Sequence, residues 1–77
     1  MREYAPHEVR LANEIADTLQ DRGSLQLFLH FAGKYKEEQL RALLEKVMSI
    51  PERKIKKTRG ALFTYLVSQY ENDNSRG

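Results

Sequence analysis

The sequence predicts an all-α fold, a compact single-domain array of about four short helices. Apolar residues recur with helical spacing in four segments, and no segment alternates between apolar and polar residues as a half-buried strand does. Glycine, proline, serine and threonine residues separate these segments. A chain of 77 residues makes one domain at most. We expect this domain to span residues 1–70, and we expect the polar residues 71–77 to form a disordered tail.

The first helix is expected at residues 6–20. Pro6 suits the first helical turn, where the missing N–H has no partner to lose. Three leucine and isoleucine residues at intervals of four form the stripe that should face the core: Leu11, Ile15 and Leu19. The segment "DRGS" then predicts the end of the helix, with Gly23 in the left-handed cap conformation and Ser24 as the cap of the next helix.

The second helix is expected at residues 25–32, with Gly33 as its end. Its apolar residues spread over more than half of its circumference, and only Gln26 and His30 mark a polar edge. A helix that is apolar nearly all round is usually the central one. We therefore expect this helix to be the hub of the core, with Phe28 fully buried.

The third and fourth helices are expected at residues 36–49 and 59–70. Glu37 and Arg41 have the i, i+4 spacing of a stabilising ion pair. Pro51 should end the third helix, because a residue that precedes proline is pushed out of helical geometry. One helical turn is predicted around residues 51–56, and Thr58 is the expected cap of the last helix. That helix should bury its apolar face: Leu62, Phe63, Leu66, Val67 and Tyr70.

The composition argues against an enzyme, a metal site and a cofactor. The chain has no cysteine, so it has neither disulfide bonds nor thiolate ligands. Its two histidines, His7 and His30, lie on different expected helices. No glycine-rich phosphate loop, metalloprotease helix or nucleophile elbow is present. Glu37 and Glu38 are adjacent on a helix, so their carboxylates diverge and cannot flank one substrate atom.

The same composition bears on location. The first ten residues contain no apolar stretch of the kind a signal peptide needs. No run approaches the roughly 20 apolar residues of a membrane span. We expect a cytoplasmic protein with no membrane partner.

A basic stretch carries the strongest local signal for function. Residues 53–59 contain five basic side chains and no acid, although the net charge of the whole chain is only +2. This stretch leads into a helix N-terminus, where free N–H groups and the helix dipole favour an anion. We expect this region to contact the phosphates of a nucleic acid through seven residues: Arg53, Lys54, Lys56, Lys57, Thr58, Arg59 and Gly60.

Tyr65 is a further candidate in the same region. It should lie beside the buried stripe of the last helix rather than within it. A partly exposed tyrosine near basic residues can stack on an unpaired base. The alternative is that Tyr65 closes the edge of the core. The basic stretch also has two alternative interpretations, as a contact for an acidic protein or another anion and as a solvated link between two helices.

The segment from Ile55 to Leu62, "IKKTRGAL", resembles a motif of DnaD-like helical domains from replication-initiation proteins. Those domains end with a segment like I-K-N-P-x-G-Y-L that leads into a last helix. Ile55, Lys56, Gly60 and Leu62 agree with it, whereas Lys57, Thr58 and Ala61 depart. The "KYKEEQLRALLEKV" helix is also similar to the one that precedes that segment, and the likeness covers about residues 32–67. The resemblance implies DNA association and contact with replication proteins.

Taken together, these patterns predict a small non-catalytic protein that binds nucleic acid, with DNA favoured over RNA, as a replication or mobile-element accessory factor. The alternative hypothesis is a protein–protein adaptor or inhibitor that uses an apolar helix face. An excess of exposed leucine and phenylalanine on the second helix would favour this alternative. A homodimer would suit a chain with so small a core.

Overall fold

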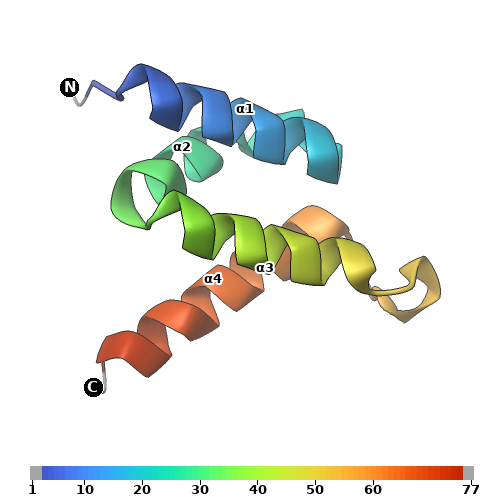
Figure 1. Ribbon diagram of the computed structural model, residues 1–77. Coiled ribbons are helices and arrows are strands. Elements are labelled where there is room, and N and C mark those ends of the chain that lie inside the picture. Colours follow the sequence, from blue (N-terminus) through green and yellow to red (C-terminus); the bar gives the residue numbers. More distant parts are fainter. Residues whose placement is uncertain (1–2, 76–77) are drawn as a thin grey trace.

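The chain folds into an all-α array, as the sequence predicts. The computed structural model describes the backbone of residues 3–75 and the side chains of residues 3–71, and that part contains four α-helices and no strand (Figure 1). The helices are α1 (Pro6–Leu19), α2 (Leu25–Lys34), α3 (Glu37–Ser49) and α4 (Arg59–Ser75). Short 3-10 turns, η1 (Arg22–Ser24) and η2 (Glu52–Lys54), precede α2 and follow α3.

The four helices are arranged so that one connection projects from the end of the molecule. α1 and α2 pack against each other as an antiparallel pair, and α3 packs against α4. The first turn of α1 and the last turn of α4 lie at the left of Figure 1, whereas the connection between α3 and α4 lies at the right. The basic stretch therefore lies far from the first turn of α1 and the last turn of α4.

Aromatic contacts between α2 and α4 form the centre of the core. Phe28 has no exposed surface, and its ring meets that of Phe63 edge-on, with centroids 5.9 Å apart. Phe31 lies 6.3 Å from the same Phe63 ring. The burial of Phe28 is as expected, and α2 joins the α1 side of the core to α4. The remaining core side chains come from all four helices: Leu11, Ala12, Ile15, Ala16, Leu19, Ala32, Leu40, Leu44, Val47 and Val67.

The end of α1 differs from the sequence-based expectation. Gln20, and not Gly23, adopts the left-handed conformation, with φ 55° and ψ 44°. The backbone N–H of Asp21 donates to the carbonyl of Ala16 at 2.9 Å, and that of Gln20 donates to Asp17 at 3.2 Å, which is the Schellman arrangement. Gly23 lies in the following turn, η1, without a positive φ. The expected glycine cap was therefore wrong.

Two helices extend beyond their expected ends. α2 passes through Gly33 and ends at Lys34, where Tyr35 takes an extended conformation. α4 continues through Ser75, so most of the expected disordered tail at residues 71–77 is helical, and residues 76–77 lie outside the described part. The Lys34 ammonium bonds to the Glu71 carboxylate, which attaches α4 beyond Tyr70 to the end of α2.

The region around α3 agrees with the sequence-based expectation. The Glu37 carboxylate accepts a hydrogen bond from Nε of Arg41 at 2.7 Å. Ile50, before Pro51, is extended with φ −79° and ψ 128°, which ends the helix. The helical turn expected around residues 51–56 is η2. Within residues 3–75, no helix combines the length and apolar character that a membrane crossing requires.

The burial of Phe28 predicts a large loss of stability on truncation. Phe28→Ala should lower the free energy of unfolding by about 3–5 kcal/mol, because it removes a fully buried ring and leaves a cavity beside Phe63. Leu27→Ala, one residue away and 38% exposed, is the matched control and should cost far less. Urea unfolding of the three proteins measures the difference. Equal losses for the two variants would contradict the central position of Phe28.

The cap of α1 predicts opposite responses at two neighbouring positions. Gln20→Gly should raise the free energy of unfolding by about 1 kcal/mol, because glycine removes the steric cost of the left-handed conformation. Gly23→Ala should be tolerated, because φ is not positive there and a Cβ would meet only Oδ1 of Asp21 at 3.8 Å. Thermal unfolding checks both variants. If Gly23→Ala destabilised the protein and Gln20→Gly left its stability unchanged, Gly23 and not Gln20 would be the left-handed cap.

Candidate nucleic-acid interface

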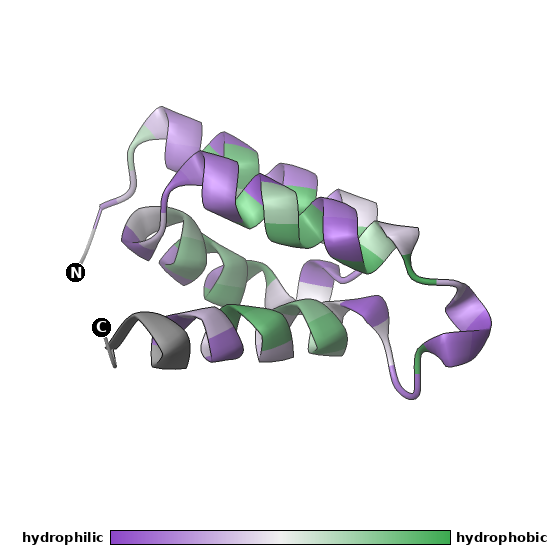
Figure 2. Cartoon of the chain, turned by 60° about the horizontal axis from the view of Figure 1, so that its bottom comes forward, coloured by the Kyte–Doolittle hydropathy of each residue, from purple (hydrophilic) through white to green (hydrophobic). Residues whose placement is uncertain are grey.

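The connection between α3 and α4, residues 51–58, is a hydrophilic loop that we call the basic loop. It projects from the helices at the right of Figure 2. All four of its basic side chains are exposed: Arg53, Lys54, Lys56 and Lys57. None of the four forms an ion pair with an acid among the side chains of residues 3–71. The loop carries four basic residues against one acid, Glu52, and therefore presents an excess of positive charge.

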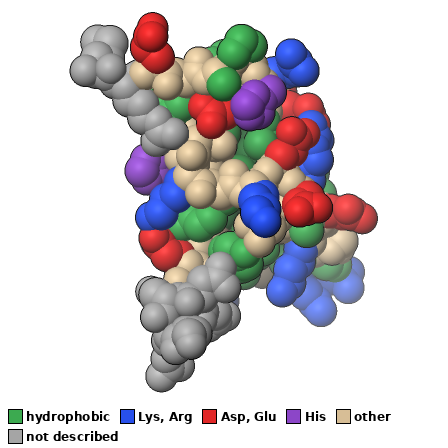
Figure 3. All heavy atoms as spheres, turned by 60° about the vertical axis from the view of Figure 1, so that its left-hand side comes forward, with side chains coloured by type: hydrophobic (Ala, Val, Ile, Leu, Met, Phe, Trp, Pro, Cys, Tyr) green, Lys and Arg blue, Asp and Glu red, His purple; other side chains and the backbone are tan. Residues whose placement is uncertain are grey.

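Three basic residues elsewhere, Arg22, Lys34 and Arg41, form ion pairs, whereas Arg10, Lys36 and Lys46 form none with a described side chain. Arg41 bonds to the carboxylates of Glu14 and Glu37, and its hydrogen bonds to Glu14 lower the pKa of that carboxyl. Lys34 lowers the pKa of Glu71 in the same way. Figure 3 shows acidic and basic side chains intermingled on one face of the molecule. Arg41 and Lys34 are paired with acids, which reduces their attraction for an external anion, whereas the four cations of the basic loop form no ion pair with a described side chain, although Glu52 precedes them in the loop.

Arg59, the first residue of α4, closes the end of α3. Its Nη1 donates to the carbonyl oxygens of Val47 at 2.7 Å and Ile50 at 3.0 Å, and the side chain is partly buried. These carbonyls belong to the last turn of α3 and the residue after it, where the helix lacks its own donors. Part of the Arg59 guanidinium therefore stabilises the fold, and its expected contact with phosphate stays a prediction.

Thr58 is the N-cap of α4, as the sequence predicts. Its Oγ1 accepts a hydrogen bond from the backbone N–H of Ala61 at 3.0 Å. This bond satisfies one of the free N–H groups in the first turn. The Thr58 hydroxyl proton is still available as a donor, since the oxygen is the acceptor in the cap.

Gly60 is buried and lies against the side chain of Asp21. A Cβ at position 60 would overlap Oδ2 of Asp21 and lie 3.1 Å from its Cγ. The Asp21 carboxylate thus lies beside the first turn of α4, where the helix dipole favours negative charge. Gly60 therefore serves close packing with Asp21, and its expected role in phosphate approach stays a prediction.

Asp21 is the residue that sequence reasoning missed. It follows the left-handed Gln20, and that turn of the backbone directs it towards α4. No local pattern predicts this contact, because the two partners are far apart in the sequence.

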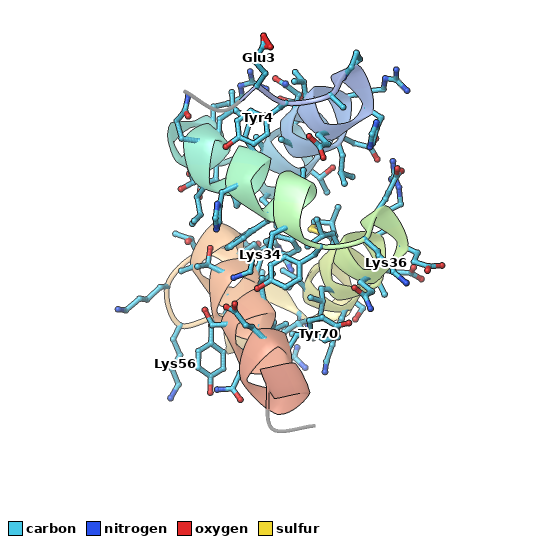
Figure 4. The ribbon with its side chains drawn as sticks, turned by 90° about the vertical axis from the view of Figure 1, so that its left-hand side faces the viewer. Glu3, Tyr4, Lys34, Lys36, Lys56 and Tyr70 are labelled. Carbon is cyan, nitrogen blue, oxygen red and sulfur yellow. The ribbon has the colours of Figure 1, made fainter. Side chains whose placement is uncertain are left out.

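A groove lies between the basic loop and α4, with a volume of 440 Å³. We call it the loop–helix groove, and its lining residues are Lys54, Ile55, Lys56, Lys57, Thr58, Ala61, Leu62 and Tyr65. Tyr65 is 58% exposed, so it does not close the edge of the core. Figure 4 shows Lys56 extending away from the bundle beside α4. The structure therefore brings three expected lysines together with Thr58 and Tyr65, and it leaves Arg53, Arg59 and Gly60 outside the groove lining.

A second hollow, of 480 Å³, lies on the other side of the basic loop. It shares Ile55, Lys57 and Thr58 with the loop–helix groove, but its wall includes the exposed acid Glu52. A carboxylate in the wall repels a phosphate. The loop–helix groove is the better site for an anionic ligand.

The histidines do not form a metal or catalytic site with each other. His7 and His30 are both exposed, and the two histidines appear as separate patches in Figure 3. Among the described residues there is no group of three or more histidine or acidic side chains placed to hold a metal ion.

The chain was compared with protein families, curated proteins and solved structures. No protein-family model, curated protein or solved structure matches the chain. The resemblance to DnaD-like domains stays a prediction.

The contact between Gly60 and Asp21 predicts a dependence of one position on the other. Gly60→Ala should lower the free energy of unfolding by about 1–3 kcal/mol, because its methyl group overlaps the carboxylate. In an Asp21→Ala background the same change should cost less, since the overlap with Oδ2 disappears and only the contact with the Cβ of residue 21, at 3.2 Å, remains. A double-mutant cycle by urea unfolding measures this coupling. Strictly additive losses would show that Asp21 does not fill the space beside Gly60.

Proposed function

We propose that the chain is a small non-catalytic protein that binds nucleic acid by contacting backbone phosphates through the basic loop. The observation that carries this proposal is the group of four exposed cations, Arg53, Lys54, Lys56 and Lys57, without an acidic partner among the described side chains. Such a group releases counterions from a nucleic acid when it binds, which favours association without reading the sequence.

The contacts that fix the two helix ends beside the basic loop also support the proposal. Arg59 satisfies carbonyls at the end of α3, and Thr58 caps α4. Asp21 supplies the anion beside the first turn of α4. These three residues therefore serve the helix ends within the fold. The lysines of the basic loop form no such contact. Side chains that the fold does not use are free to serve a partner.

The finer parts of the proposal rest on the sequence. The likeness of residues 55–62 to DnaD-like domains favours DNA over RNA and a role as a replication or mobile-element accessory factor in the cytoplasm. The alternative, an adaptor with an apolar helix face, receives less support from α2, because Phe28 and Phe31 are buried and only Leu27 among its leucines is exposed.

The proposal predicts a steep dependence of affinity on salt. If about four phosphates of a duplex are contacted, log K should fall against log salt concentration with a slope of about −3.6. Lys56→Gln/Lys57→Gln should reduce the magnitude of this slope by about 1.8 and weaken binding to all sequences alike. Fluorescence anisotropy with labelled duplex and single-stranded DNA and RNA, over a salt series, measures both quantities.

A matched control removes the same charge elsewhere. Arg10→Gln/Lys36→Gln also removes two exposed positive charges, on α1 and before α3, and it should leave the slope close to that of the parent. Binding by the parent with equal slopes for the two double variants would refute the basic loop as the phosphate site. Absence of binding to any nucleic acid at low salt, with binding of an acidic amphipathic peptide, would favour the adaptor instead.

A further inference from the structure

The loop–helix groove combines an exposed aromatic ring with positive charge. Tyr65 lies 58% exposed in its wall. Ala61 and Leu62, one helical turn before Tyr65, line the same groove, because residues three and four apart share a helix face. Side chains of a helix lean towards its N-terminus, so the Tyr65 ring covers the turn nearest the basic loop. The ring and the lysines thus belong to one surface.

The groove fits a flat, partly apolar ligand that carries negative charge at its edges. Its volume of 440 Å³ is within the range of about 300–1,000 Å³ that is usual for small-molecule sites. Ile55 and Leu62 supply apolar walls, whereas Lys54, Lys56 and Lys57 supply cations. An unpaired nucleotide has this character, with an aromatic base between two phosphates. A base within a duplex does not, because its faces are covered by neighbouring base pairs.

We infer that the loop–helix groove is a nucleobase site, in which an unpaired base stacks on Tyr65 while the lysines of the basic loop hold the adjacent phosphates. This inference rests on the proposed function and adds the class of nucleic acid, namely single strands or unpaired ends. Stacking is tolerant of sequence, since every base has an aromatic face. The groove should therefore favour single strands over duplexes, without a preference for sequence.

The experiment varies the ring in the protein and the base in the ligand. The ligands are an oligothymidylate and an oligomer of equal length with abasic sites in place of its thymidines, so both carry the same phosphates. The proteins are the parent, Tyr65→Phe, Tyr65→Leu and Tyr65→Ala. Phenylalanine keeps the aromatic face, whereas leucine keeps apolar bulk without it. Thermal unfolding of each variant controls for folding, which should be little affected at so exposed a position.

The inference predicts a selective loss. Tyr65→Leu and Tyr65→Ala should bind the oligothymidylate about 5- to 150-fold more weakly than the parent, the range expected for one stacked base. Tyr65→Phe should bind like the parent. All four proteins should bind the abasic oligomer and a duplex alike, with the same salt slope, because the phosphate contacts are unchanged.

Other results separate this inference from the proposed function. Equal affinity of the parent for the two oligomers, with a slope that still depends on Lys56 and Lys57, would overturn the nucleobase site alone. Parent-like binding of oligothymidylate by Tyr65→Leu would do the same. Failure of the parent to bind either oligomer or a duplex at low salt would overturn both proposals.

Discussion

The turn from α3 into α4 is the constraint on which the candidate site depends. Two helix ends meet there, and each has backbone groups without intrahelical partners. Arg59 donates to two carbonyls at the end of α3, while Thr58 accepts an N–H of α4 and Asp21 places a carboxylate beside Gly60. Both helix ends thus have partners inside the fold, and the intervening lysines are exposed. The geometry of the turn thus decides which basic residues support the structure and which remain for a partner.

The core gives this turn a fixed base. Phe63, one turn into α4, meets Phe28 and Phe31 of α2, and Val47, whose carbonyl accepts from Arg59, is itself fully buried. The end of α3 and the start of α4 are therefore tied to the same hydrophobic cluster. Tyr65 follows Phe63 by two residues, which turns its ring away from the core and towards the groove. The packing of Phe63 in the core therefore determines that α4 presents Tyr65 on its opposite side.

Local signals in the sequence were enough to predict most helices. Pro6, Pro51 and Thr58 mark their ends by backbone rules that act within a few residues. The two failures at glycine show that this residue alone does not locate a helix end, because α1 is already capped at Gln20 before Gly23 and α2 passes through Gly33 to Lys34. The extension of α4 past Tyr70 involves a contact between helices, since the Lys34 ammonium of α2 forms an ion pair with the Glu71 carboxylate.

The candidate site was predictable only in part. The run of charge located the basic loop, and helical spacing placed Tyr65 beside the core stripe. Nothing local distinguishes the structural Arg59 from the free lysines, because that difference depends on the carbonyls of Val47 and Ile50. The contact of Asp21 with Gly60 could not be predicted either, because these two residues are far apart in the sequence. Charge patterns show which residues are cations, whereas the fold decides which of them are already engaged.

The most direct test of the account is a titration of the isotopically labelled protein with oligothymidylate, followed by two-dimensional NMR of its backbone amides. The account predicts that the largest shifts are confined to residues 53–58 and to Ala61, Leu62 and Tyr65, which form the basic loop and the groove. The amides of α1 and α2 should change little. Shifts centred on α1 or α2, or binding without any change in the basic loop, would contradict it.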